Sequence, residues 1–154
     1  MKYQDPSCYL PHEAPMLLLD EVLEADDRHC LCLSIVSSQK RLAPFLNADG
    51  SLPSLVGTEL IFQCIGVYAG ILDQIMNRPK LCVGMALGSR DFKTNCQTFA
   101  KNSRLLINVD MLMNDDSIGC FYGGIKSFDT ILCSGRFTVY RPSDDEIIKL
   151  CSRS

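Results

Sequence analysis

The stretch SLVGTELIFQCIGVYAGILDQIM, residues 54–76, is the longest apolar run of this chain and decides its fold. The run predicts a single long helix, because apolar residues continue for more than five helical turns. Pro53 precedes it, where a proline suits the first turn of a helix, while Asn77 and Pro79 end it. Apolar residues occupy almost every face, so we expect the helix to be buried all round.

The few polar and small residues of this run share one stripe. Glu59, Gln63, Gly66, Gly70 and Asp73 follow helical spacing. Three interpretations are open: a membrane span, a core helix in which Glu59 only caps or pairs, and a site at the start of the helix. A charged residue inside a span costs about 2.5–3.5 kcal/mol, so we expect no membrane and favour the site. Gly66 and Gly70 would let a strand backbone pack against the helix.

Length and composition restrict the class of protein. A chain of 154 residues, with 47% hydrophobic and 21% charged residues, is long enough for one globular domain with a sizeable core. The net charge of −3 provides no basic surface for nucleic acid. The first 15 residues lack the apolar core of an export signal. We therefore expect a cytoplasmic protein that binds neither nucleic acid nor a membrane.

The cysteines favour the same compartment. There are nine, an odd number, and they are scattered through apolar segments, which fits core thiols in a reducing cytoplasm better than a disulfide framework. Cys30 and Cys32 have the wrong spacing for a zinc knuckle, and no second pair follows. The sequence therefore predicts no metal and no cofactor.

The remaining elements are strands and turns. Three prolines make residues 1–15 an extended arm rather than a helix. Residues 37–52 read as a loop, and the tail 143–154 opens with a capping-box pattern that predicts a short final helix. Strands are expected at residues 18–25, 29–36, 81–92, 104–113, 118–126 and 131–140.

This order of elements predicts an α+β protein of the hotdog type. Consecutive strands joined by short turns form an antiparallel sheet. A single apolar helix must be covered, and a curved sheet wrapped around it provides that cover. We expect one domain over residues 1–154, with residues 1–15 as an N-terminal arm and residues 143–154 as a C-terminal tail.

Two motifs resemble a known family at this point. Residues 10–22, LPHEAPMLLLDEV, resemble the opening LPHxxPxLLxDxV of hotdog-fold 3-hydroxyacyl-[acyl-carrier-protein] dehydratases, and residues 57–63, GTELIFQ, resemble the start of their central helix. The subgroup tied to aryl polyene biosynthesis is the most similar. Its likeness is carried by residues 52–57, 68–70 and 136–142.

The resemblance implies an activity and partners. Such an enzyme eliminates water from a 3-hydroxyacyl thioester and gives a trans-2-enoyl thioester in fatty-acid or polyene-type biosynthesis. The substrate is carried by an acyl carrier protein. The protein would be a homodimer, or a hetero-assembly with another hotdog protein, with the acyl tunnel at the interface. Candidate cations for the acidic carrier are Arg78, Lys80, Arg90, Lys93, Lys101 and Arg104.

The chemistry of dehydration suggests roles for individual residues. The reaction needs a base near C2, an acid near the C3 hydroxyl and polarisation of the thioester carbonyl. Glu59 is the candidate acid and His12 the candidate base. For substrate binding, the sequence offers the backbone amides at the start of the helix, the amide side chain one turn after Glu59, and a glycine that permits close backbone approach. These substrate-binding candidates are Val56, Gly57, Gln63 and Gly84.

One departure from the family keeps alternatives open. Housekeeping fatty-acid dehydratases carry their histidine in a GHFPG-type loop before the helix, whereas residues 47–51 here, NADGS, contain none. Either His12 supplies the base, or Glu59 works with another partner, or the reaction has been lost. We expect His29 to be a strand residue and Asp49 a turn residue. Two further functions stay open: a non-catalytic acyl-binding or partner subunit of an active dehydratase, and an acyl thioesterase.

Overall fold

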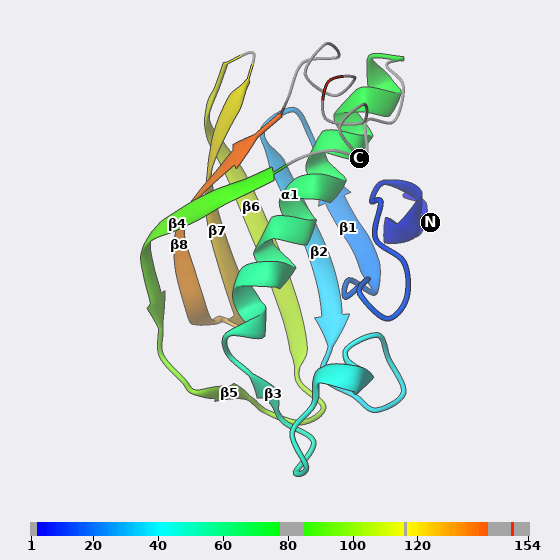
Figure 1. Cartoon of the computed structure of the whole chain (residues 1–154). Helices are drawn as coiled ribbons and strands as arrows, with labels where there is room; N and C mark the ends of the chain where they lie inside the picture. The colour runs from blue at the N-terminus through cyan, green and yellow to red at the C-terminus, as the bar shows by residue number, and fades with distance from the viewer. Residues whose placement is uncertain (1–2, 78–84, 116, 142–148, 150–154) are drawn as a thin grey trace.

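A long helix lies across one face of an antiparallel sheet in the computed structural model, which describes residues 3–77, 85–115, 117–141 and 149 (Figure 1). The sheet has six strands in the order β1-β2-β6-β7-β8-β4. The helix is α1 (Val56–Ile75). The strands of the sheet are β1 (Glu21–Ala25), β2 (His29–Ile35), β4 (Met85–Thr94), β6 (Arg104–Asn114), β7 (Ile118–Ser127) and β8 (Thr130–Tyr140). This is the predicted α+β hotdog architecture.

Short elements complete the described fold. Strands β3 (Leu52–Pro53) and β5 (Thr98–Phe99) form a separate two-stranded sheet beside the start of α1. Two 3-10 helices, η1 (Pro6–Cys8) and η2 (Ala43–Phe45), lie in the arm and in the loop after β2. The prediction of an arm without helix was wrong at η1, which Asp5 caps by accepting a hydrogen bond from the Ser7 N–H.

Element boundaries differ from the predicted ones where side-chain contacts compete with strand pairing. The first strand begins at Glu21 instead of residue 18, because the Leu18 N–H donates to a side chain of α1 rather than to a neighbouring strand. Pro53 belongs to β3 and not to the first turn of the helix. The predicted C-terminal helix falls on residues outside the described ones, apart from Lys149, which is helical.

The helix is buried on the side that faces the sheet. It is not buried all round, so that prediction from the sequence was wrong. Leu60, Ile61, Cys64 and Val67 are fully buried in the core between α1 and the sheet. Phe62 is only partly buried. The wrong prediction follows from the geometry of one sheet, which covers one side of a helix and leaves the opposite side to other segments.

The N-terminal arm covers part of that opposite side. A Cβ placed on Gly70 would lie 2.6 Å from the Tyr9 carbonyl oxygen, and one placed on Gly66 would lie 2.6 Å from Leu10 Cδ2. The expectation that a strand packs at these glycines was therefore wrong, since the arm occupies the space. The polar and small stripe of the helix is the surface against which the arm packs.

The far end of the stripe is tied to the sheet by an ion pair. Arg141, just after β8, contacts both carboxylate oxygens of Asp73 at 2.7 Å. Asp73 is only 4% exposed, so its charge needs such a partner. By length and composition α1 could also cross a membrane, but its apolar face packs against the sheet as a core helix does.

Candidate functional site

The arm brings His12 to Glu59. His12 Nε2 lies 3.6 Å from Glu59 Oε1, and both side chains are partly exposed, at 32% and 44%. Glu59 is in the first turn of α1, where a carboxylate interacts favourably with the helix dipole. The two residues named by sequence as base and acid thus face each other at one end of the helix. His12 Nδ1 is buried and has no hydrogen-bond partner among the described residues.

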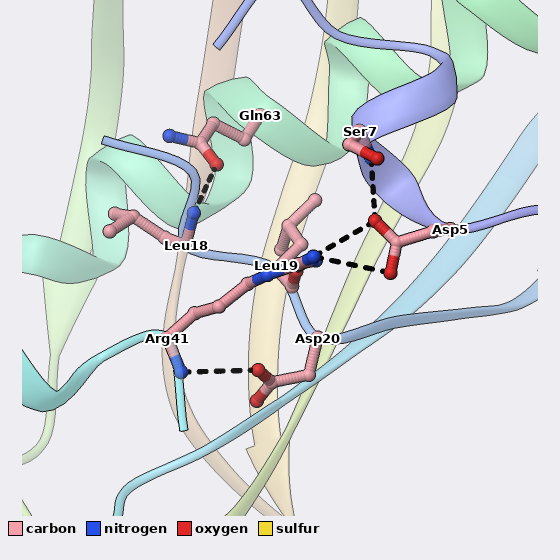
Figure 2. Close-up of polar contacts among 7 residues, drawn as sticks. All are labelled: Asp5, Ser7, Leu18, Leu19, Asp20, Arg41 and Gln63. Atoms are coloured by element: carbon pink, nitrogen blue, oxygen red, sulfur yellow. Dashed lines mark hydrogen bonds and ion pairs between the residues drawn. The ribbon is translucent and has the colours of Figure 1, made fainter. Parts of the chain in front are cut away.

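Gln63 joins the acid to the arm. It is 1% exposed, and its Nε2 donates to Glu59 Oε1 at 3.1 Å and to the Met16 carbonyl at 2.8 Å. Its Oε1 accepts the Leu18 N–H at 3.0 Å (Figure 2). The hydrogen bond expected between Gln63 and Glu59 is present. Because its amide is hydrogen-bonded at both the nitrogen and the oxygen, its contacts favour positioning Glu59, and a role in binding the substrate stays a prediction.

The Arg41 side chain joins the two ends of the segment that carries His12. Its Nη1 donates to the Leu19 carbonyl at 2.7 Å, and its Nη2 contacts both carboxylate oxygens of Asp5, at 3.0 and 3.2 Å. Figure 2 shows the guanidinium between these two segments, with Asp20 held against the Arg41 backbone N–H. Both ends of the segment from residue 5 to 19 are therefore held by the Arg41 side chain. No local pattern in the sequence predicts this role, because Arg41 stands in a loop and its partners are distant in the chain.

The start of α1 has fewer free backbone N–H groups for binding a thioester than the sequence suggested. The Gly57 N–H donates to the Ser54 carbonyl at 2.9 Å. A Cβ at Gly57 would point into the core, 3.3 Å from Ile125 Cδ1 and 3.4 Å from Cys133 Sγ. The absence of a side chain at Gly57 therefore serves packing against the sheet, and its role in binding the substrate stays a prediction. No hydrogen bond of the described residues gives the Val56 N–H an acceptor.

Aromatic rings lie on the Glu59 side of the helix. Phe62, three residues after Glu59, packs edge to face against Phe137 at a centroid distance of 5.2 Å. Phe92 of the edge strand β4 also contacts Phe137, at 6.2 Å. Phe137 is fully buried, while Phe62 and Phe92 remain partly exposed. An apolar and aromatic surface therefore adjoins the carboxylate.

Other candidates from the sequence lie elsewhere. His29 is on β2 and hydrogen-bonds Asn108, and Asp49 accepts from the backbone and hydroxyl of Ser51, as expected of a strand and a turn residue. Those bonds lower the pKa of the exposed Asp49 carboxyl. Gly84 lies outside the described residues. So do two of the candidate cations, while the other four are exposed: Arg90, Lys93, Lys101 and Arg104.

A single long helix covered by an antiparallel sheet defines a hotdog-fold protein, and here a histidine and a glutamate are paired at the helix start. The comparisons give the family. A model of the ApeP-like dehydratases, described as ApeP dehydratase, matches residues 4–149, and the chain belongs to this family.

Solved structures agree with that membership. A chain of the dehydratase heterocomplex ApeI:P from Xenorhabdus doucetiae is 37% identical, with a TM-score of 0.91, and the match covers 97% of this chain and 99% of that chain. The phenylacetic acid degradation protein PaaI of E. coli is 11% identical with a TM-score of 0.60, covering 79% and 82% of the two chains. That second likeness shows the fold alone. No curated protein matches the chain.

Proposed function

We propose that this protein is a 3-hydroxyacyl-[acyl-carrier-protein] dehydratase that forms a trans-2-enoyl thioester, with His12 as base and Glu59 as acid. The observation that carries the proposal is the separation of 3.6 Å between His12 Nε2 and Glu59 Oε1 at the start of α1. A histidine and a carboxyl group at this distance can act on adjacent carbons of one substrate. Membership of the ApeP-like dehydratase family supports the same reaction.

The proton balance follows from the pair. Neutral His12 takes the C2 proton, the C2–C3 double bond forms, and the C3–O bond breaks as the carboxylic acid of Glu59 protonates the leaving hydroxyl. Water leaves, and the pair is left as imidazolium and carboxylate. Since these groups face each other, the proton can return from His12 to Glu59 and restore the starting state. Gln63 keeps the carboxyl group oriented during this cycle.

The thioester carbonyl needs a donor as charge develops on its oxygen. The Val56 N–H is our candidate, because it is in the first turn of α1 on the same side as Glu59. A backbone N–H at a helix start is a fixed dipole that requires no reorganisation during the reaction. The partly exposed Phe62 and Phe92 would line the path of the acyl chain. Rings there favour an aryl or conjugated chain, which agrees with a role in aryl polyene biosynthesis.

Assembly with a second hotdog protein is part of the proposal. Strand β1 at one edge of the sheet is covered by the arm, because the Tyr3 hydroxyl is hydrogen-bonded to both backbone groups of Ala25. Strand β4 at the other edge is exposed along almost its whole length, with Leu87 57% exposed. Such an edge is suited to pairing with another chain. The similar chain from Xenorhabdus doucetiae belongs to a heterocomplex.

The carrier protein and the compartment complete the proposed setting. An acyl carrier protein has an acidic surface, and the exposed Arg90 and Lys93 on β4 provide positive charge beside the proposed assembly edge. We place the protein in solution in the cytoplasm, where such carriers and reduced thiols occur together.

Mass spectrometry of a 3-hydroxyacyl carrier protein, with a reductase present to trap the enoyl product, tests the proposal. We expect product from the wild type, and a loss of about 100-fold or more in Glu59→Gln and His12→Ala, the usual size of general acid–base catalysis. His29→Ala is the matched control, because it removes the only other histidine and should leave the rate unchanged. Wild-type rates in both Glu59→Gln and His12→Ala would refute the assignment.

The same assay separates the alternatives. A non-catalytic subunit would give no enoyl product by itself, and its Glu59→Gln variant would support a partner's activity fully. A thioesterase would release free thiol from the carrier without forming the enoyl group.

A further inference from the structure

Three buried thiols meet between β2 and α1, away from the proposed catalytic pair. Cys30 and Cys32 stand two residues apart on one face of β2, and Cys64 of α1 faces them. All three are fully buried, and their Sγ atoms lie within 4.8 Å of one another. The Sγ atoms of Cys30 and Cys32 are 3.9 Å apart. The i, i+2 spacing was unsuited to a zinc knuckle, but the helix supplies the third sulfur.

These distances suit one ion bound to three sulfurs. A metal–thiolate bond is about 2.3 Å, so three sulfurs around one centre lie up to roughly 4 Å apart. The pair on β2 already has this separation, and the third sulfur needs only a small adjustment. The thiols of Cys30 and Cys32 are within hydrogen-bond distance of each other. The Cys64 Sγ also donates to the Cys30 and Ile107 carbonyls, at 3.7 and 3.5 Å, which holds it beside the pair on β2.

Charge decides which ion fits an apolar core. Three thiolates around a monovalent ion carry −2 and around a divalent ion −1, and a buried uncompensated charge is costly. Zinc also takes four ligands, so with the three that the described residues supply it would need a water or another donor inside the apolar core. A trivalent thiophilic ion gives a neutral complex with three ligands. Arsenite, As(OH)3, exchanges its three hydroxyls for three thiolates, and each thiol proton leaves as part of a water molecule.

We propose that Cys30, Cys32 and Cys64 form a binding site for a trivalent thiophilic ion of the arsenite type. The complex would fasten α1 to β2 through three sulfur bonds. Cys64 is the residue next to Gln63, which holds both Glu59 and the arm. An ion that draws Cys64 toward β2 would therefore disturb the positioning of Glu59. Entry requires α1 and β2 to separate transiently, so binding should be slow.

Sodium arsenite is the probe. Native protein, reduced with a phosphine rather than a competing dithiol, is incubated with arsenite and measured by native mass spectrometry. We expect one arsenic per chain with the loss of three protons. Peptide mapping after alkylation in denaturant should show Cys30, Cys32 and Cys64 protected among the nine cysteines.

Matched variants make the assignment falsifiable. Cys64→Ala should weaken arsenite binding by at least about tenfold, because loss of a ligand exceeds the effect of an outer-shell change. Cys133→Ala is the control, since Cys133 is a buried thiol of β8 outside the cluster, and it should bind as the wild type does. Should Cys64→Ala fail to fold, Cys32→Ser tests the same ligand set. No arsenic on the native wild type, unchanged binding in the folded cluster variant, or protection of other cysteines would overturn the proposal.

Discussion

Replacing Gly70 by alanine should push the arm away from the helix. The new Cβ would lie 2.6 Å from the Tyr9 carbonyl oxygen, 2.9 Å from Tyr9 Cβ and 3.1 Å from Tyr9 Cα. These are mainly backbone positions, so the arm must retreat by roughly 0.8 Å to reach an ordinary contact. His12 follows Tyr9 by three residues and would move with it.

Two opposing effects set the change in the free energy of unfolding of Gly70→Ala. Inserting a methyl group into a packed contact costs about 1–3 kcal/mol, and this backbone contact should fall at the upper end. Alanine recovers up to about 1 kcal/mol of helix propensity relative to glycine. Gly70→Ala should therefore lower the free energy of unfolding by about 1–2 kcal/mol. A shift of about 1 Å in a catalytic group can cost about 100-fold in rate, so the dehydration rate should fall steeply.

Gly66→Ala is the matched control. Its Cβ would meet only Leu10 Cδ2, the end of a flexible side chain, at 2.6 Å. Turning that side chain costs about 0.5–1.5 kcal/mol, which the gain in helix propensity offsets. Urea unfolding and the enoyl assay should show Gly66→Ala near wild type and Gly70→Ala reduced in both. Equal stability and equal rates in the two variants would refute the idea that the arm positions His12.

Further substitutions probe the contacts around the site and the helix end. Arg41→Ala removes the side chain that holds Asp5 and the Leu19 carbonyl. It should lower the turnover rate about tenfold and the free energy of unfolding by about 1 kcal/mol. A turnover rate equal to that of the wild type would contradict this prediction. Arg141→Ala should lower the free energy of unfolding by about 2 kcal/mol, because Asp73 keeps its buried charge without its two bonds to Arg141. Adding Asp73→Asn to this variant should restore part of the lost free energy of unfolding, measured by urea titration. If nothing is restored, the ion pair does not account for the loss.

The central helix could be predicted because its apolar run and its end signals are features of the local sequence. Residues 54–76 were expected to be helical, and α1 spans Val56–Ile75. The four strands predicted after the helix are present as β4, β6, β7 and β8, and clear turn signals separate the last three. The short strand β5 was not predicted, and residues 81–84, the expected start of the first strand, lie outside the described residues. The hotdog fold follows from how few ways one helix and one sheet can cover each other.

Details that depend on distant contacts could not be predicted from local patterns. Gly66 and Gly70 do accept a close backbone, but the sequence could not tell the arm from a strand. The local sequence suggested that a substrate could approach Gly57, but side chains of the sheet pack against this position. The spacing of Cys30 and Cys32 gave no hint of a third sulfur, because Cys64 lies 32 residues further along the chain.

The pairing of His12 with Glu59 is the central claim, and a double-mutant cycle on turnover tests it most directly. The dehydration rates of the wild type, His12→Ala, Glu59→Gln and the double variant are compared, with circular dichroism confirming that each is folded. Groups that act as one unit are strongly non-additive, so we predict that the double variant loses no more than the worse single variant. Losses that multiply would show two independent roles and contradict the account.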